Sequence, residues 1–214
     1  PFQIAFILMN IESVINPESE EREIVDLIWF PTGGGKTEAY LGLSAFTIFY
    51  RRLKGEVDLN HEKYSGTTIL MRYTLRLLTT QQYERAASLI CACELIRKDN
   101  FELGDEPISI GLWVGGSSTP NDNAKARSQL NELNNNKRFR QAPYNFVVMK
   151  CPCCAAQFGK ISNVNPRDKI KIKGLYKEDG KKGRVVFKCE NEKCEFYDKY
   201  LPLHVVDEQI YENA

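Results

Sequence analysis

A run of three glycines followed by Lys36 and Thr37 constrains this chain more than any other feature of its sequence. It follows an apolar stretch that predicts a strand over Val25–Phe30, and it opens a helical pattern over Lys36–Leu53. Glycines at such a junction let backbone N–H groups wrap a phosphate at the positive end of the helix. The sequence therefore predicts a P-loop made by Thr32, Gly33, Gly34, Gly35, Lys36 and Thr37.

The chemistry of such a loop assigns a role to its last two residues. Lys36 is expected to neutralise the β- and γ-phosphates of ATP, and the Thr37 hydroxyl to coordinate Mg²⁺. Lys36 and Thr37 are thus the candidate catalytic residues, with ATP and Mg²⁺ as cofactors. One position departs from the general pattern, because Phe30 stands where a glycine is usual. The alternative interpretation is that the segment is a glycine-rich turn and that Lys36 follows it by chance.

The rest of the N-terminal part alternates strand and helix patterns. Thr68–Arg72 and Ile108–Val114 predict strands on either side of a helical pattern over Gln81–Lys98. Phe146–Met149 predicts a fourth strand, and Asp122–Leu133 a further helix. Strand and helix alternating in this way, in a chain of 214 residues, predict an α/β fold with a parallel sheet.

Cysteines mark the C-terminal part, where five of the seven lie between residues 151 and 194. Without a secretory signal, clustered thiols favour a metal site over a disulfide framework. A Cys-x₂-Cys knuckle at Cys151 and Cys154, with a second pair at Cys189 and Cys194, predicts a closed, structural zinc site of four thiolates. Cys153 is the spare thiol. An iron–sulfur cluster and a set of core cysteines without a ligand are the alternatives.

The residues around these cysteines predict a small β module that is rich in lysine. Ile170–Tyr176 and Arg184–Lys188 alternate like two strands, and residues 177–183 between them have turn chemistry. Residues 160–188 hold ten Lys or Arg and three Asp or Glu, whereas the whole chain has a net charge of only +1. This basic arm either follows phosphates or is a solvated hairpin; its cations are Lys169, Lys171, Lys173, Lys181, Lys182 and Arg184.

Several of these segments resemble the motifs of superfamily 2 helicases. Residues 31–37 resemble motif I, and Thr68–Gln82 resembles motif Ia, whose loop contacts the nucleic-acid backbone. Ile110–Pro120 resembles the segment with a glycine pair after the third strand. On this resemblance the nucleic-acid-binding residues are Arg72, Thr74, Arg76, Gln81, Gly115 and Gly116. Pro1-Phe2-Gln3 resembles the end of the signature in which a glutamine, here Gln3, reads adenine; a buried glutamine in a helix is the alternative.

Together with the cysteine cluster, these motifs are similar to the helicase subunit of DISARM-type bacterial phage-defence systems. The resemblance implies a RecA-like ATP-binding core over residues 1–149, a zinc-ribbon insertion over 150–200 and a return segment over 201–214. It also implies an ATP-driven motor that acts on nucleic acid, DNA above all, alongside partner proteins of the defence system. A second motor domain is absent, so this chain is expected to bind nucleotide without efficient turnover. The alternatives are a P-loop switch ATPase that does not track nucleic acid, and a zinc-ribbon binding module with a degenerate ATP site.

Three further expectations come from the ends of the chain and from its apolar and charged residues. Asp207 and Glu208 have the composition of an ATPase acidic motif, but Pro202 and His204 interrupt the preceding strand, which favours a structural or linker role. The chain begins with Pro1, which indicates a piece of a longer protein. No apolar run is long enough to span a membrane and no basic leader is present, so a cytoplasmic protein without membrane contact is expected.

Overall fold

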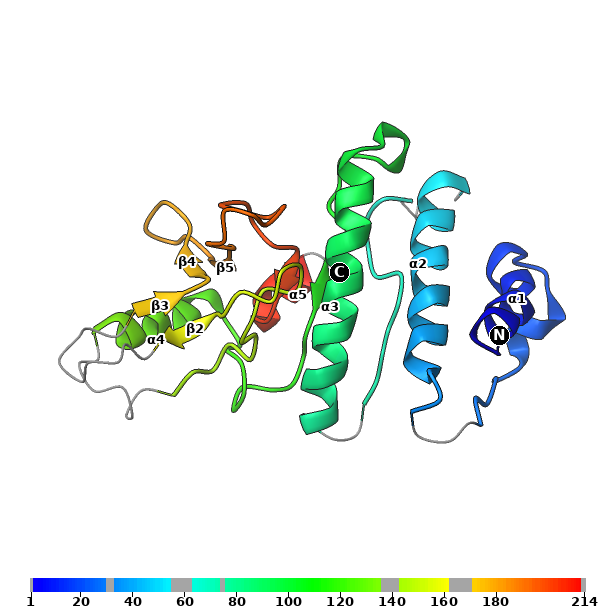
Figure 1. Ribbon diagram of the computed structural model, residues 1–214, viewed down its shortest axis with the longest axis horizontal. Coiled ribbons are helices and arrows are strands. Elements are labelled where there is room, and N and C mark those ends of the chain that lie inside the picture. Colours follow the sequence, from blue (N-terminus) through cyan, green and yellow to red (C-terminus); the bar gives the residue numbers. More distant parts are fainter. Residues whose placement is uncertain are drawn as a thin grey trace. The chain divides into compact units, whose positions relative to one another are not determined.

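The computed structural model describes residues 2–29, 33–54, 63–73, 76–135, 143–161 and 171–212 (Figure 1). The chain forms two compact units: unit 1 comprises residues 1–71 and 97–106, and unit 2 comprises residues 72–96 and 107–214. The boundary between the units cuts the C-terminal end of helix α3 (Arg76–Lys98). The division into a core over residues 1–149, an insertion over 150–200 and a return segment over 201–214 stays a prediction.

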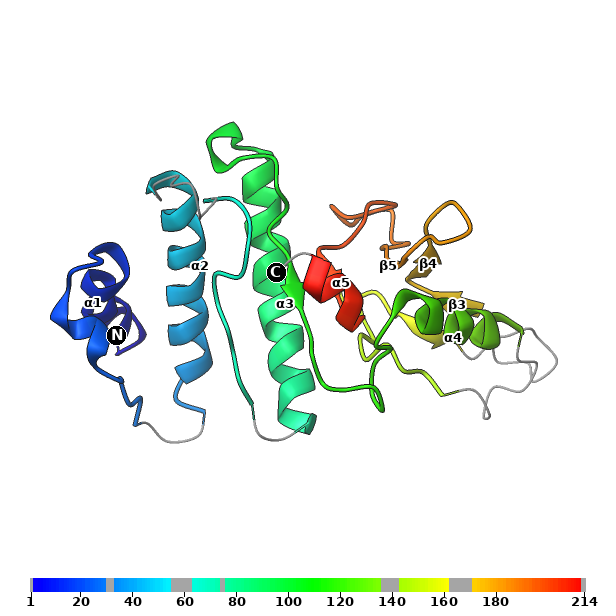
Figure 2. The same ribbon diagram turned by 180° about the vertical axis from the view of Figure 1, so that it is seen from behind.

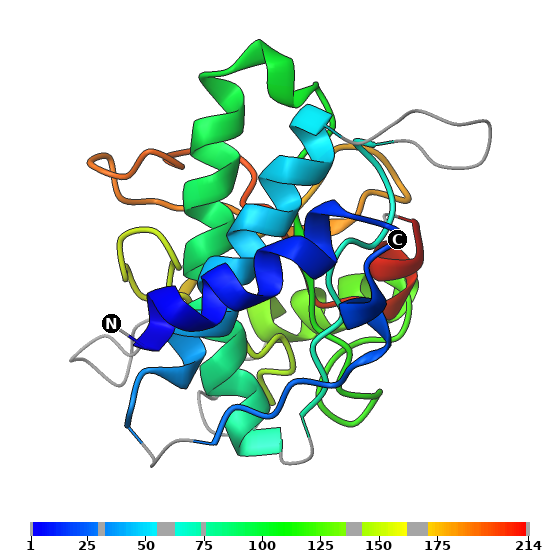
Figure 3. The same ribbon diagram turned by 90° about the vertical axis from the view of Figure 1, so that its right-hand side faces the viewer.

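Unit 1 is built around two helices, α1 (Phe2–Ile15) and α2 (Lys36–Lys54). Figure 3 shows α1 running across α2. The helices approach closely at Gly42, where an added Cβ would lie 2.8 Å from the Cδ1 atom of Ile7. Two short 3-10 helices, η1 (Glu20–Glu23) and η2 (Phe101–Leu103), complete the unit.

Helix α2 begins directly after the glycine run, and its charges favour that position. Glu38 lies in its first turn, and Arg51, Arg52 and Lys54 lie in its last turn, which complements the helix dipole at both ends. Near its C-terminal end the buried guanidinium of Arg52 donates hydrogen bonds to three backbone carbonyls. By donating to buried carbonyls, the Arg52 side chain connects two distant segments of unit 1, at Tyr64 and at residues 103–106, to helix α2.

The described residues of unit 2 form most of α3, two more helices and three two-stranded sheets. Strands β1 (Ile110–Gly111) and β6 (Leu203–His204) pair in parallel, with Ile110 opposite Leu203. The two antiparallel sheets join β2 to β3 and β4 to β5. The bounds are β2 Gly159–Ile161, β3 Lys171–Lys173, β4 Leu175–Lys177 and β5 Val185–Phe187, and the helices are α4 Asn123–Asn135 and α5 Asp207–Glu212.

One hydrophobic core runs through unit 2 and includes part of the cysteine module, the name used for residues 143–161 and 171–200. Phe146, Phe158, Phe187 and Phe196 are its largest fully buried side chains. Helix α4 contacts β3 and β5 (Figure 2). It turns Ala126, Leu130 and Leu133 inward, three and four residues apart, as the helical period requires. The module is therefore packed into the unit rather than attached by a flexible linker.

The structure confirms the predicted helices. The predicted Lys36–Leu53 corresponds to α2, Gln81–Lys98 lies within α3, and Asp122–Leu133 corresponds to α4. The predicted hairpin of the module is also present as β4 and β5, although Gly174 separates β3 from β4.

The predicted RecA-like parallel sheet is not shown by the described residues. Residues 25–29, 68–72 and 146–149 form no strand there, and the third predicted strand is reduced to Ile110–Gly111. An extended segment becomes a strand only when a neighbour accepts and donates its backbone hydrogen bonds. In the described part of the chain, β1 pairs in parallel with β6, which lies in the predicted return segment. The fold is thus mixed α/β with one short parallel pair.

No helix in the described ranges combines the length and the apolar character needed to cross a membrane.

Candidate metal centre

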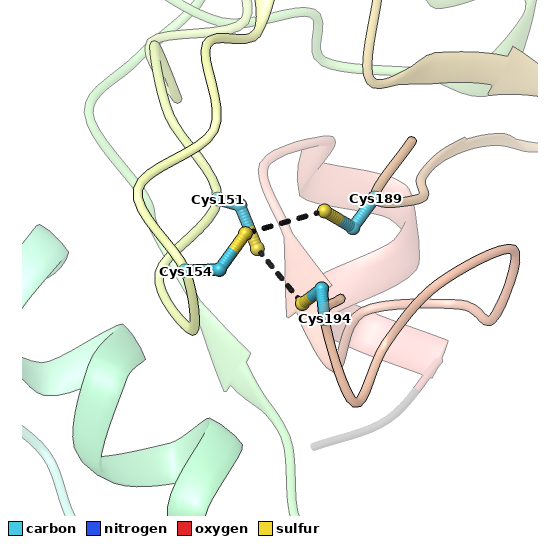
Figure 4. Close-up of side chains that lie close together, drawn as sticks. All are labelled: Cys151, Cys154, Cys189 and Cys194. Carbon is cyan, nitrogen blue, oxygen red and sulfur yellow. Dashed lines mark hydrogen bonds between the residues drawn. The ribbon is translucent and has the colours of Figure 1, made fainter. Parts of the chain in front are cut away.

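Four cysteine sulfurs converge in unit 2, as the spacing of the cysteines predicted. The ligand atoms of Cys151, Cys154, Cys189 and Cys194 all lie within 4.8 Å of one another (Figure 4). The Sγ atoms of Cys151 and Cys194 are 3.9 Å apart, and those of Cys154 and Cys189 are 3.5 Å apart. Sulfurs placed tetrahedrally at about 2.3 Å from a zinc ion are roughly 3.8 Å from one another. The observed separations therefore suit a tetrahedral metal ion.

The first pair of ligands lies on a tight turn. The Cys151 N–H donates to the Ala156 carbonyl, and the Ala155 N–H donates back to the Cys151 carbonyl, both at 2.8 Å. Ala155 has a φ of 61°, in the left-handed region that a non-glycine residue adopts only when its surroundings demand it. This turn folds Cys154 back toward Cys151, so that a local backbone conformation sets one edge of the site.

The second pair is positioned by Asn191, which sequence reasoning did not single out. Its backbone N–H donates to the Cys189 sulfur at 3.4 Å, and its side-chain amide donates to the Cys154 sulfur at 3.5 Å. Its carbonyl accepts from the Cys194 N–H at 2.9 Å. Donors of this kind stabilise thiolates and orient them toward a metal. The position two residues after the first cysteine of a pair is the signal that could have identified it.

The electrostatics of the four cysteine side chains favour a bound cation. Burial raises the pKa of the Cys151 thiol, the N–H groups of Cys154 and Cys153 lower it, and the nearby Cys189 and Cys194 raise it further. For Cys154 burial also acts to raise the pKa, but hydrogen bonds to its sulfur outweigh burial and lower it to about 7. Burial raises the pKa of Cys189 to about 11. Four thiolates so close together repel one another, and a divalent cation removes that repulsion.

The site is closed to solvent on most sides. Cys151 and Cys189 are each 1% exposed and Cys194 is 6% exposed, while Cys154 is half-buried. Stacked rings of Phe158 and Phe187, with centroids 6.2 Å apart, belong to the core that surrounds it. Cys153 is exposed and lies outside the group of four. A closed set of four sulfurs leaves no position for a substrate, which is the arrangement of a structural site.

The predicted P-loop residues lie in unit 1, with Thr32 outside the described residues. Gly33 and Gly35 have φ values of 86° and 78°, the left-handed conformation that glycine adopts without strain. The Gln3 side chain donates to the Gly34 carbonyl at 3.4 Å. The Thr37 hydroxyl accepts from the Tyr40 hydroxyl at 3.2 Å. The structure thus brings Gln3 to the glycine run, while the binding of a nucleotide there stays a prediction.

The predicted nucleic-acid contacts are spread over several elements of unit 2. Arg72 lies exposed in an irregular segment, Arg76 is the first residue of α3, and Gln81 is exposed on that helix. Gly115 has a φ of 83° and begins a turn, where its carbonyl accepts from the Ser118 N–H at 2.9 Å. The Gly116 carbonyl accepts from the Lys125 ammonium at 3.4 Å. Thr74 lies outside the described residues, and the role of the whole set stays a prediction.

Asp207 and Glu208 occupy the first turn of α5, which is separated from the end of β6 by two residues. A Glu208 carboxylate oxygen accepts from the Asn123 N–H at 2.7 Å, at the N-terminus of α4. Asp207 is buried, and burial raises the pKa of its carboxyl group against the opposing effect of Lys125. Glu208 thus accepts from the first backbone N–H of α4, which otherwise has no partner within that helix.

Comparison with known proteins finds a relative that is similar along nearly the whole of this chain. The chain is 42% identical over 214 residues to DISARM protein DrmA of Bacillus paralicheniformis, an alignment that covers 99% of this chain and 18% of DrmA. No family model matches the chain, and no solved structure matches it. The prediction of a superfamily 2 helicase is wrong: the protein that the chain resembles along its length is a DISARM protein, DrmA, and not a helicase.

Proposed function

We propose that this chain belongs to a protein of phage defence and that its four-cysteine centre holds a structural zinc ion. One observation carries the proposal: the sulfurs of four cysteines from two distant segments lie within 4.8 Å of one another. The likeness to DISARM protein DrmA supports the defence role. The zinc ion would fix the module in unit 2, so that the surfaces of the module keep a defined shape.

Zinc fits these ligands better than the alternatives do. Four thiolates in a tetrahedron suit Zn²⁺, which has no redox chemistry and no demand for a further ligand. Hydrogen bonds from Asn191 supply the outer shell that structural zinc sites have. An iron–sulfur cluster has the same ligands but absorbs visible light, which gives a direct means of telling the two apart.

The test compares ligand cysteines with the spare one in the intact defence protein. We expect Cys151→Ser and Cys189→Ser to lose about one zinc ion per chain, measured by elemental mass spectrometry, because three thiolates no longer close the site. Both variants should also lose protection in a phage plaque assay. Cys153→Ser is the matched control, with unchanged metal and unchanged protection. Wild-type protein that contains no zinc, or a coloured protein that contains iron, would contradict the proposal.

A second candidate function is the binding of a nucleoside triphosphate with Mg²⁺ by unit 1. It is favoured by the left-handed Gly33 and Gly35, which precede Lys36 at the start of a 19-residue helix. An added Cβ at Gly35 would lie 2.2 Å from the Gln3 amide nitrogen, so the loop and Gln3 leave no room for a larger residue. In this arrangement Lys36 would neutralise phosphate charge, Thr37 would bind Mg²⁺, and Gln3 would lie near the base.

Calorimetric titration of the chain with MgATP tests this second function. Lys36→Ala is expected to weaken binding by at least about tenfold, because a charge-assisted hydrogen bond to phosphate is lost. Lys54→Ala removes a lysine from the other end of the same helix and should leave the affinity unchanged. Equal affinities for wild type and Lys36→Ala would remove the phosphate site from consideration.

A further inference from the structure

The outer face of the β4–β5 sheet carries a cation between two aromatic rings. The Lys188 ammonium lies 5.8 Å from the centroid of the Tyr176 ring and 4.9 Å from that of the Tyr200 ring. Tyr176 is 36% exposed and Tyr200 is 50% exposed. These three residues, Tyr176, Lys188 and Tyr200, are called the tyrosine–lysine platform below.

The pleat of the sheet explains why these side chains share one face. Leu175 and Phe187 are opposite each other on β4 and β5, and both turn into the core. Their neighbours Tyr176 and Lys188 therefore turn outward, since successive side chains on a strand alternate. An isolated antiparallel bridge pairs Lys188 with Tyr200, which sets the second ring beside the lysine. The three side chains of the platform thus project from backbone segments that are paired with one another.

Two carboxylates contact the side chains of the platform. The Tyr176 hydroxyl donates to the Glu190 carboxylate at 2.7 Å. The Lys188 ammonium is 3.3 Å from an Asp198 oxygen, and the Asp198 side chain is 78% exposed. The Lys188 side chain is 24% exposed, but its partner Asp198 lies mostly in solvent, so solvent and salt screen the pair and it contributes little. An incoming phosphate can therefore replace Asp198 at small cost.

The surroundings of the platform are basic. The described residues 143–161 and 171–200 contain eleven Lys or Arg and six Asp or Glu, a net charge of +5 in a chain whose total is +1. Lys181 and Lys182 at the turn of the hairpin and Lys199 next to Tyr200 are exposed. The excess positive charge is thus concentrated in the module that carries the exposed rings, and it complements a polyanion.

We propose that the tyrosine–lysine platform binds single-stranded DNA. The phosphodiester backbone would pair with Lys188 and its lysine neighbours, and unpaired bases would stack on the rings of Tyr200 and Tyr176. The faces of the bases are buried in a duplex, and an acidic polypeptide has no bases. Neither ligand would therefore use both the rings and the lysine of the platform. Pairing with phosphates and stacking of bases are shared by single-stranded DNA and RNA, and the comparison of oligo(dT) with oligo(rU) distinguishes the two. The proposal rests on the structural metal site only in that the module must be folded.

Fluorescence anisotropy of a labelled 20-nucleotide oligo(dT) tests the proposal with the zinc-loaded chain. Tyr200→Ala is expected to weaken binding by about tenfold, since one stacked base is lost. Lys188→Gln should lower the slope of log Kd against log salt by about 0.7, the value for one phosphate contact on a single strand. Asp198→Ala should tighten binding, because it frees the Lys188 ammonium. Phe101→Ala and Lys54→Gln, an exposed aromatic residue and a lysine of unit 1, should change nothing.

Four outcomes would overturn the proposal. One is an equal loss in the platform variants and the two controls. The others are equal affinity for duplex DNA, equal competition by polyglutamate, and tighter binding of oligo(rU) than of oligo(dT). Zinc content measured on every variant separates this test from that of the metal centre. A variant that keeps its zinc and loses DNA binding supports the platform, whereas zinc-free wild type with intact DNA binding contradicts only the metal proposal.

Discussion

Removing the metal from the four-cysteine centre is expected to unfold the cysteine module, at a cost on the order of 10 kcal/mol of folding free energy. The reason is electrostatic as well as geometric. Without a cation, the buried thiols of Cys151 and Cys189 must take up protons, and the two segments that carry them lose the bond that joins them. Hydrogen–deuterium exchange before and after treatment with a chelator measures the effect.

The exchange experiment carries its own control. Residues 143–161 and 171–200 should lose protection when the metal is removed, while α2 in unit 1 should keep its exchange rates. The core residues Phe158, Phe187 and Phe196 lie in the segments expected to respond, so the loss should spread beyond the ligands themselves. Unchanged protection of the module after complete metal loss would show that apolar packing alone holds it together.

Truncation of Arg52 is expected to produce the second-largest effect, a loss of about 3 kcal/mol in the unfolding free energy. Its guanidinium donates to the carbonyls of Leu103 and Glu106 at 2.8 and 2.7 Å and to that of Tyr64 at 3.1 Å. Arg52 is only 5% exposed, so water cannot readily replace its donors in an Arg52→Ala variant. Urea denaturation followed by the circular dichroism of the helices measures the change.

Arg51→Ala is the matched control on the same helix. Arg51 also donates to backbone and side-chain oxygens, at Ser65, Gly66 and Thr68, but Ser65 and Gly66 are exposed. Water can take over from the lost donors there, and we expect a change of roughly 1 kcal/mol or less. Equal losses in the two variants would mean that burial does not distinguish these arginines.

The helices and the metal ligands could be predicted because their signals are local. The apolar spacing of α2 and α4 specifies a helix with little help from the rest of the chain. The ligand pairs are each close in sequence, and the reactivity of thiols toward metal makes their spacing informative. The left-handed conformations at Gly33 and Gly35 likewise follow from a property of glycine itself.

The parallel sheet could not be predicted in the same way, because strands depend on distant partners. Val25 and Leu27 are residue types that are frequent in buried strands, yet these two residues are 93% and 82% exposed. The pairing of Ile110 with Leu203 was missed because Pro202 and His204 hide the strand character of β6. Asn191 and Arg52 were missed for another reason: their importance lies in hydrogen bonds that only the folded backbone reveals.

The parallel pair of β1 and β6 also has a consequence for the order in which unit 2 folds. Ile110 and Leu203 are 93 positions apart in the chain (203 − 110), so their encounter closes a long loop. A metal ion that joins Cys151 to Cys194 removes 43 of those positions from the path. The shortened path lowers the entropy cost of loop closure by about 0.5 kcal/mol. Zinc binding before this contact forms is therefore expected to speed its formation.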